Sequence, residues 1–297
     1  MRKLFGIIPP TTTPFDIDGA IDYGAARAQA RWLVNQGVHG LASGGSTGEG
    51  QTFEVDEFRR LIAETLDEVG EEVPVIAGVI VDSTRDAIRR ARAVADLGVA
   101  ALQVTPVHYL FRPDEKAMLE HFRVLAEATE LPVIIYNVVP WSYLSPQLLC
   151  QIMRDVPGVI GVKQSAGDLK LVADLLLLAQ HDDVILSAVD PLLYPSFTLG
   201  VHGSIAAILS AAPAASVALW DAVQSGEHRR ALDLHRRLLP LWNAIVGDNL
   251  PACVKFAQAL QGCPSFFPRA PMPRANTAQQ TAVRQALAGL CLEIAGV

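Results

Sequence analysis

Eight short apolar runs, most of them rich in valine and isoleucine, recur along the chain and alternate with longer segments of helical character. Continuous apolar runs of this length are typical of parallel strands that are buried on both faces. Eight strands, each followed by a helix, are the number needed to close a parallel barrel. The predicted strands are Phe5–Ile8, Gly40–Ser43, Val75–Val79, Ala101–Thr105, Val133–Val138, Val159–Lys163, Val184–Ala188 and Gly203–Ile208.

The segments between these runs carry the signals of helix starts and ends. Ser83 is an N-cap residue, Gly98 follows the end of the same segment, and Ser145 precedes a proline at a first helical position. The predicted helices run from Asp22 to Val34, from Glu54 to Val69, from Ser83 to Leu97, from Pro113 to Ala128, and onward from Ser145.

The pattern predicts an α/β protein, a single (β/α)₈ TIM barrel over residues 1–225. Residues 226–297 are predicted to form a C-terminal helical extension of the same domain, with helices at 227–245, 250–262 and 277–293 and a proline-rich loop at 264–273. The main rival is an open doubly wound sheet. That fold usually has a glycine-rich phosphate turn after its first strand, where this chain has Ile8-Pro9-Pro10-Thr11.

Composition excludes several classes of protein. Hydrophobic residues make up 51% of the chain and charged residues 19%, which excludes intrinsic disorder. The net charge of −7 argues against a nucleic-acid partner. No apolar run reaches the roughly 20 residues of a spanning helix, so no membrane partner is expected, and the first apolar run is too short for a signal peptide. The four cysteines form no C-x-x-C pair, and we expect a reduced, cytoplasmic protein.

The active site of such a barrel lies at the carboxyl ends of the strands. Lys163 ends the sixth predicted strand, whereas the other four lysines lie at terminal or helical positions. A buried amine is costly, and desolvation lowers its pKa so that the neutral amine can attack a carbonyl group and form a Schiff base. A lysine that snorkels or forms a salt bridge at the strand end explains its position equally well.

Other strand ends contribute polar side chains to the same edge. Tyr136 could relay protons near an amine, although a locally satisfied aromatic side chain is the simpler interpretation. The run Gly44-Gly45-Ser46-Thr47-Gly48-Glu49 could form an anion nest suited to a carboxylate. Asp190 could bind a polar substrate group or cap the helix that follows at Pro191. The seven histidines show no metal-ligand spacing, so no metal site is expected.

Three motifs taken together resemble the dihydrodipicolinate synthase / N-acetylneuraminate lyase family of class I aldolases. They are Gly45-Ser46-Thr47-Gly48-Glu49, Tyr136-Asn137, and the run from Gly161 through Lys163 to Leu169. The resemblance covers nearly the whole chain. It implies a (β/α)₈ barrel, a homotetramer, and a lyase that holds pyruvate or another 2-oxo acid as a Schiff base and needs no further cofactor.

The resemblance also implies roles for particular residues. Lys163 would be the Schiff-base lysine and Tyr136 the acid and base at the reacting carbon. Ser46 and Thr47 would hold the carboxylate, with backbone contacts from Ile205. The substrate-binding residues would also include Ser165, Asp190, His108 and Tyr109, and either His108 or Tyr109 could complete a proton relay with Tyr136 and Ser46.

The reaction implied is the making or breaking of a carbon–carbon bond, or the dehydration of a 2-keto-3-deoxy acid. One alternative is a 4-hydroxy-tetrahydrodipicolinate synthase, which joins pyruvate to aspartate semialdehyde. After Tyr136-Asn137, however, this chain lacks the Arg-Thr-Gly sequence of those synthases, and Trp141 stands nearby. Pro191 also replaces the glutamate that follows the aspartate in sialic acid lyases. Another alternative is a relative that binds 2-oxo acids without catalysis.

Overall fold

Eight parallel strands form one curled sheet in the computed structural model, which describes residues 3–264 and 266–290. The sheet runs from β1 through β8 and then in descending order to β2, and a parallel bridge between Pro10 and Ala42 joins its two edges. The predicted (β/α)₈ barrel is therefore confirmed. The strands are β1 (Gly6–Ile7), β2 (Leu41–Ser43), β3 (Val75–Val79), β4 (Ala101–Val104), β5 (Val133–Asn137), β6 (Val159–Gln164), β7 (Val184–Ser187) and β8 (Gly203–Ser204).

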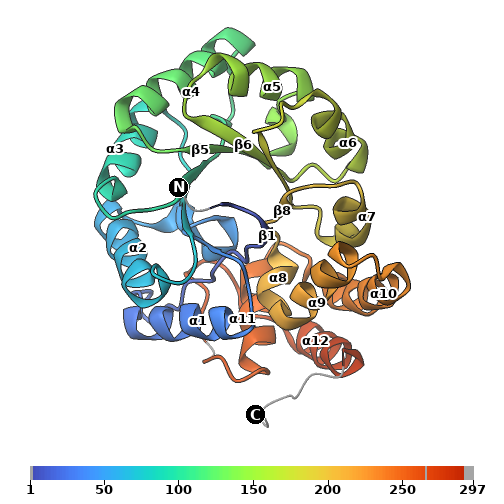
Figure 1. The fold of residues 1–297 in the computed structure, drawn as a ribbon. Coiled ribbons are helices and arrows are strands. Elements are labelled where there is room, and N and C mark those ends of the chain that lie inside the picture. Colours follow the sequence, from blue (N-terminus) through green and yellow to red (C-terminus); the bar gives the residue numbers. More distant parts are fainter. Residues whose placement is uncertain (1–2, 265, 291–297) are drawn as a thin grey trace.

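Helices surround the strands as an outer ring, which is seen along the barrel axis in Figure 1. The ring contains α1 (Tyr23–Asn35), α2 (Val55–Val69), α3 (Thr84–Val94), α4 (Glu115–Thr129), α5 (Pro146–Asp155), α6 (Leu169–Leu178), α7 (Leu193–Thr198), α8 (Ala207–Ala211) and α9 (Pro213–Gln224). Several begin at the side-chain caps that the sequence predicts. The Ser83 hydroxyl accepts a hydrogen bond from the Asp86 N–H, and the Ser145 hydroxyl accepts one from the Leu148 N–H.

The apolar residues divide into two clusters. The larger one packs the helices against the outside of the strands. The smaller one fills the inside of the barrel with Leu4, Ile8, Ala42, Ile76, Ala101, Ile134, Leu186 and Ile205. The barrel interior is thus a packed core, as the fold requires, and it closes the barrel beneath the carboxyl ends of the strands.

The first and last strands are shorter than predicted, with two residues each. Pro9 and Pro10 follow β1 and have no N–H to donate to a neighbouring strand. Gly203 of β8 pairs with Gly6 of β1, and a Cβ on Gly203 would overlap the backbone of Gly6. The strands therefore meet closely at the point where the barrel closes, and the chain leaves β8 at once toward α8.

Three further helices follow the barrel: α10 (His228–Ile245), α11 (Leu250–Ala259) and α12 (Thr277–Gly289). Their starts agree with the predicted segments, whereas the predicted end at 293 lies outside the described residues. Helix α11 packs against α8 and α12 and against the 3-10 turn Ser46–Gly48 after β2. The C-terminal helices therefore reach the carboxyl ends of the strands. A domain boundary at residue 225 stays a prediction.

Cys150, Cys253 and Cys263 are buried and free, and Cys291 lies outside the described residues. Among the residues that the structure describes, no helix is long and apolar enough to cross a membrane.

Candidate active site

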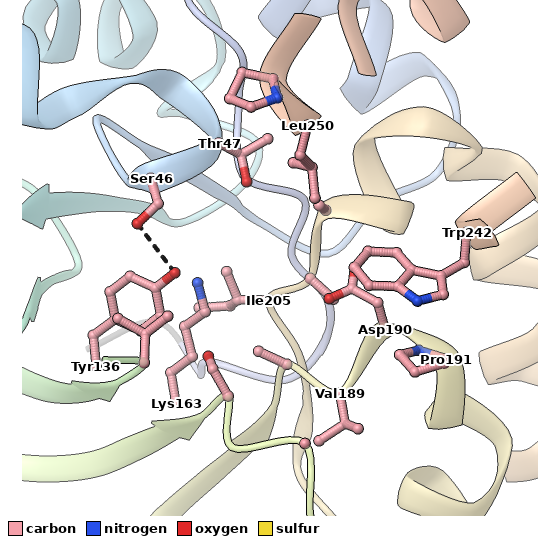
Figure 2. A pocket seen from close by; sticks show the side chains of 17 residues that line it. Ser46, Thr47, Tyr136, Lys163, Val189, Asp190, Pro191, Ile205, Trp242 and Leu250 are labelled. Atoms are coloured by element: carbon pink, nitrogen blue, oxygen red, sulfur yellow. Dashed lines mark hydrogen bonds between the residues drawn. The ribbon is translucent and has the colours of Figure 1, made fainter. Parts of the chain in front are cut away.

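A pocket of about 430 Å³ opens at the carboxyl ends of the strands (Figure 2). Its charged side chains, within the described part of the chain, are Lys163 and Asp190. The other lining residues are polar or apolar and come from strand ends, from the loops after them and from the C-terminal helices. They are Ser46, Thr47, Tyr136, Val138, Ser165, Gly167, Ala188, Val189, Pro191, Ile205, Ala206, Ala207, Trp242, Leu250 and Pro251.

Lys163 projects from β6 into this pocket and is only 4% exposed. It is in register with Tyr136 of β5, so the two side chains leave the same face of the sheet. The Lys163 Nζ lies 3.7 Å from the centroid of the Tyr136 ring. Burial lowers the pKa of Lys163 from 10.5 to about 7, and the negative charge of Asp190 partly opposes that shift. A neutral, nucleophilic amine is therefore abundant near neutral pH.

Tyr136 directs its hydroxyl into the pocket toward Ser46 (Figure 2). The hydroxyl donates a hydrogen bond to Ser46 Oγ over 3.3 Å, as Figure 2 shows. Burial raises the pKa of Tyr136 to about 12, while the hydroxyls of Ser46 and Ser165 act in the opposite direction. The phenol therefore keeps its proton near neutral pH and can donate it to an oxygen that develops negative charge beside Lys163.

The loop after β2 folds into a tight 3-10 turn, Ser46–Gly48, that presents Ser46 and Thr47 to the pocket. Gly44 has φ 76°, a left-handed conformation that favours glycine. The Thr13 hydroxyl donates a 2.7 Å hydrogen bond to the Gly48 carbonyl. The two hydroxyls thus lie on a turn that the β1 loop holds in place, and they face the amine across the pocket.

Asp190 lines the pocket on the side away from Ser46 (Figure 2). Its Oδ1 accepts a 2.8 Å hydrogen bond from the N–H of Ile208 in α8. Burial raises the pKa of Asp190 to about 6, against the hydrogen bond from Ile208 and the charge of Lys163. The carboxylate therefore binds the start of α8 and not the helix at Pro191, and it also faces the pocket.

Ile205 and Ser165 also lie in the pocket wall. The Ile205 N–H donates to the Ser187 carbonyl, so it is already engaged within the sheet. His108 and Tyr109 are not among the lining residues; their N–H groups bind Asp82 Oδ1, and the Tyr109 side chain is 74% exposed. The structure brings seven of the nine predicted site residues together and leaves these two outside the pocket.

Trp242, Leu250 and Pro251 form a wall of the pocket that the sequence did not predict. These residues belong to α10 and α11, far along the chain from the strand ends, and only the packing of the C-terminal helices brings them to the pocket. Nothing in their local sequence distinguishes them from other apolar positions on a helix. In the described ranges, no group of three or more histidine, cysteine, aspartate or glutamate side chains could hold a metal ion.

Comparison with known proteins identifies relatives over nearly the whole chain. The model of the dihydrodipicolinate synthetase family matches residues 3–290. The chain is 35% identical to the 4-hydroxy-tetrahydrodipicolinate synthase of Methanopyrus kandleri over 98% of its own length and 97% of that protein.

Solved structures show the same fold. YagE from Escherichia coli K12, a prophage protein of the dihydrodipicolinic acid synthase family solved in complex with pyruvate, is 25% identical with a TM-score of 0.92, covering 97% of this chain and 99% of that one. A monomeric dihydrodipicolinate synthase variant is 26% identical with a TM-score of 0.92 and coverage of 97% for both chains.

Proposed function

This chain belongs to the dihydrodipicolinate synthetase family and is a lyase of the class I aldolase type, and we propose that it binds pyruvate as a Schiff base on Lys163. The observation that carries the proposal is a buried amine with a pKa of about 7 beside a protonated phenol. The relative solved with pyruvate supports the choice of this 2-oxo acid.

The chemistry follows from the positions of these groups. The neutral Lys163 amine adds to the pyruvate carbonyl, Tyr136 supplies a proton to the oxygen, and water leaves to give a protonated imine. Tyr136 is left as a phenolate after giving up its proton. The imine withdraws electrons, so this phenolate can take a methyl proton, which restores the phenol and gives an enamine. The enamine carbon then attacks an aldehyde to make a carbon–carbon bond, and hydrolysis of the imine releases the product and the free lysine. Cleavage is the reverse sequence.

Ser46 and Thr47 are proposed to bind the carboxylate of the 2-oxo acid. Both line the pocket on the same short turn, and Ser46 already accepts a hydrogen bond from Tyr136. A carboxylate held there is oriented relative to the imine, so the reacting methyl group is fixed near Tyr136. This arrangement requires no metal ion and no bound cofactor, because the imine itself serves as the electron sink.

The aldehyde is proposed to carry no negative charge at its far end. Trp242, Leu250 and Pro251 give this end of the pocket an apolar wall, and Asp190 adds a carboxylate. With pyruvate bound to Lys163 as the imine, Ser46 and Thr47 already hold the pyruvate carboxylate. A carboxylate on the aldehyde would then lie near Asp190 and be repelled by its negative charge. A hydroxyl group would instead find a hydrogen-bond partner in Asp190.

The second candidate is a 4-hydroxy-tetrahydrodipicolinate synthase, because relatives at 35% and 36% identity carry that name. An aldehyde panel separates the two. Aspartate semialdehyde should be a poor acceptor compared with a neutral hydroxyaldehyde such as glyceraldehyde if the charge argument holds. A clear preference for aspartate semialdehyde would establish the second candidate.

The donor half-reaction can be tested without knowing the aldehyde. We expect the protein to exchange the methyl protons of pyruvate with D₂O, measured by proton NMR, because enamine formation removes one of them. The Lys163→Met variant should show no catalysed exchange. Lys170→Met removes an exposed lysine paired with Asp174 and should exchange at the wild-type rate. Exchange by Lys163→Met at the wild-type rate would refute the proposal.

A homotetramer is proposed as the assembled form. Tyr109, Leu110, Phe111 and Trp141 expose between 66% and 78% of their surface near the active-site edge, and the Trp141 indole donates to the His108 carbonyl. Such a cluster of exposed apolar side chains is typical of a protein interface. Sedimentation of the purified protein tests this; a monomer at micromolar concentration would contradict it.

A further inference from the structure

A buried ion pair connects the loop after β2, which contains the turn Ser46–Gly48, to a helix of the C-terminal extension. Lys255 of α11 donates to Glu49 Oε1 over 2.6 Å, and the two side chains are 3% and 1% exposed. We propose that Lys255 is a positioning residue that, through Glu49, fixes the turn presenting Ser46 and Thr47 to the carboxylate of the 2-oxo acid. This inference rests on the proposed function for the identity of the ligand.

Glu49 is the residue that ends this turn. Its N–H donates to the Ser46 carbonyl over 3.0 Å, and its carbonyl accepts from the Thr52 N–H and hydroxyl. Its backbone is left-handed, with φ 60° and ψ 30°, a conformation that is unfavourable for a residue with a side chain. The surroundings must therefore hold Glu49 in this conformation, and the conformation of the turn depends on it.

The carboxylate of Glu49 supplies that restraint with both of its oxygens. Oε1 accepts from Lys255, and Oε2 accepts from the backbone N–H of Arg269 over 2.8 Å. Lys255 also donates to the Phe267 carbonyl over 2.7 Å, and its Nζ lies 4.7 Å from the centroid of the Phe15 ring. Three segments that are distant in sequence are thereby joined at one carboxylate.

The same helix forms another part of the pocket. Leu250 and Pro251 in the first turn of α11 line the wall, and Lys255 lies little more than one turn further along. The helix also packs against the turn Ser46–Gly48. Its position therefore sets the carboxylate site and the aldehyde wall together.

Stability alone does not account for this pair. Replacing a buried ion pair by uncharged side chains is often neutral or stabilising, whereas removing one partner leaves an unpaired buried charge. The geometry that the pair imposes on the turn is the better explanation of its presence here. The double variant Glu49→Gln/Lys255→Met removes both charges and leaves neither one unpaired, so it is the variant that should fold.

The test compares this double variant with the wild type in the pyruvate exchange assay. We expect the KM for pyruvate to rise by about tenfold or more, with kcat at saturation changed less than about threefold, because the carboxylate site is loosened while Lys163 and Tyr136 are untouched. Leu125→Ala is the matched control. Leu125 is buried in α4, on the opposite side of the barrel from α11 (Figure 1). Truncating it destabilises the protein at a site far from the turn, so this variant shows what a loss of stability alone does to the KM.

Hydrogen exchange of the peptide covering residues 44–50 provides a readout that does not depend on catalysis. The double variant should exchange these amides faster than the wild type, and Leu125→Ala should not change them selectively. An unchanged KM together with unchanged exchange in a folded double variant would overturn the proposal, and so would an equal rise of KM in Leu125→Ala. A wild-type protein that exchanges no pyruvate protons would instead refute the proposed function, and the hydrogen exchange would still decide whether Lys255 fixes the turn.

Discussion

Replacing Lys163 by methionine should make the protein more stable, by an amount that decreases as the pH rises. The folded-state pKa of Lys163 is about 7 against an ordinary value of 10.5. Between these values the unfolded chain binds more protons than the folded one, so the wild type gains stability as the pH rises through this window. Methionine keeps the apolar volume of the side chain and does not titrate.

The size of the effect follows from those two pKa values. One pKa unit corresponds to about 1.4 kcal/mol, so keeping the amine buried destabilises the wild type by about 4 kcal/mol at pH 7 and about 1 kcal/mol at pH 9.5. The advantage of Lys163→Met should therefore fall by roughly 3 kcal/mol between these two pH values. Asp190, with a pKa of about 6, titrates mainly below this window.

Urea unfolding followed by circular dichroism at pH 7 and pH 9.5 measures the difference in the free energy of unfolding between Lys163→Met and the wild type. Lys170→Met is the matched control, because Lys170 is exposed and its pKa is raised by Asp174. Since Lys170 stays protonated at both pH values, the stability of this variant relative to the wild type should change little between them. A difference between Lys163→Met and wild type that is the same at pH 7 and pH 9.5 would refute the reasoning, because it would mean that Lys163 is not desolvated.

Further predictions concern the reaction. Tyr136→Phe should lower kcat for pyruvate exchange by about 10²–10⁴-fold, since it removes the proton donor; an unchanged kcat would exclude Tyr136 from proton transfer. The kcat/KM for pyruvate should fall as the pH drops below about 7, because protonated Lys163 cannot attack, and a pH profile that stays flat down to pH 5 would contradict this. Asp190→Asn should move that acid limb to lower pH, since Asp190 raises the pKa of Lys163; a shift to higher pH would be the wrong sign. Thr47→Val should raise the KM for pyruvate with little effect on kcat, and loss in kcat alone would argue against carboxylate binding.

The sequence predicted the barrel because its signals are local. Valine and isoleucine runs mark buried strands, and caps such as Ser83 and Ser145 mark helix starts, so each element could be identified from its own residues. The rule that places active sites at the carboxyl ends of barrel strands then directed attention to Lys163, Tyr136 and Ser46, and the structure brings these three side chains together.

The remaining features depend on contacts between distant segments. The wall residues Trp242 and Leu250 reach the pocket only because α10 and α11 pack beside the barrel. The pairing of Glu49 with Lys255 spans 206 residues and has no signature at either position. Of the two roles considered for Asp190, the cap of the helix at Pro191 was wrong: its carboxylate accepts from the N–H of Ile208, since β7 and the chain after β8 are neighbours in the barrel. Its place in the pocket wall leaves the substrate-binding role as a prediction.

Borohydride reduction in the presence of pyruvate, followed by peptide mass spectrometry, tests the central claim most directly. If Lys163 forms the Schiff base, one reduced pyruvate adduct should appear per chain, on the peptide that contains Lys163, and Lys163→Met should carry none. An unmodified Lys163 in the folded wild-type protein, or an adduct on another lysine, would contradict the account.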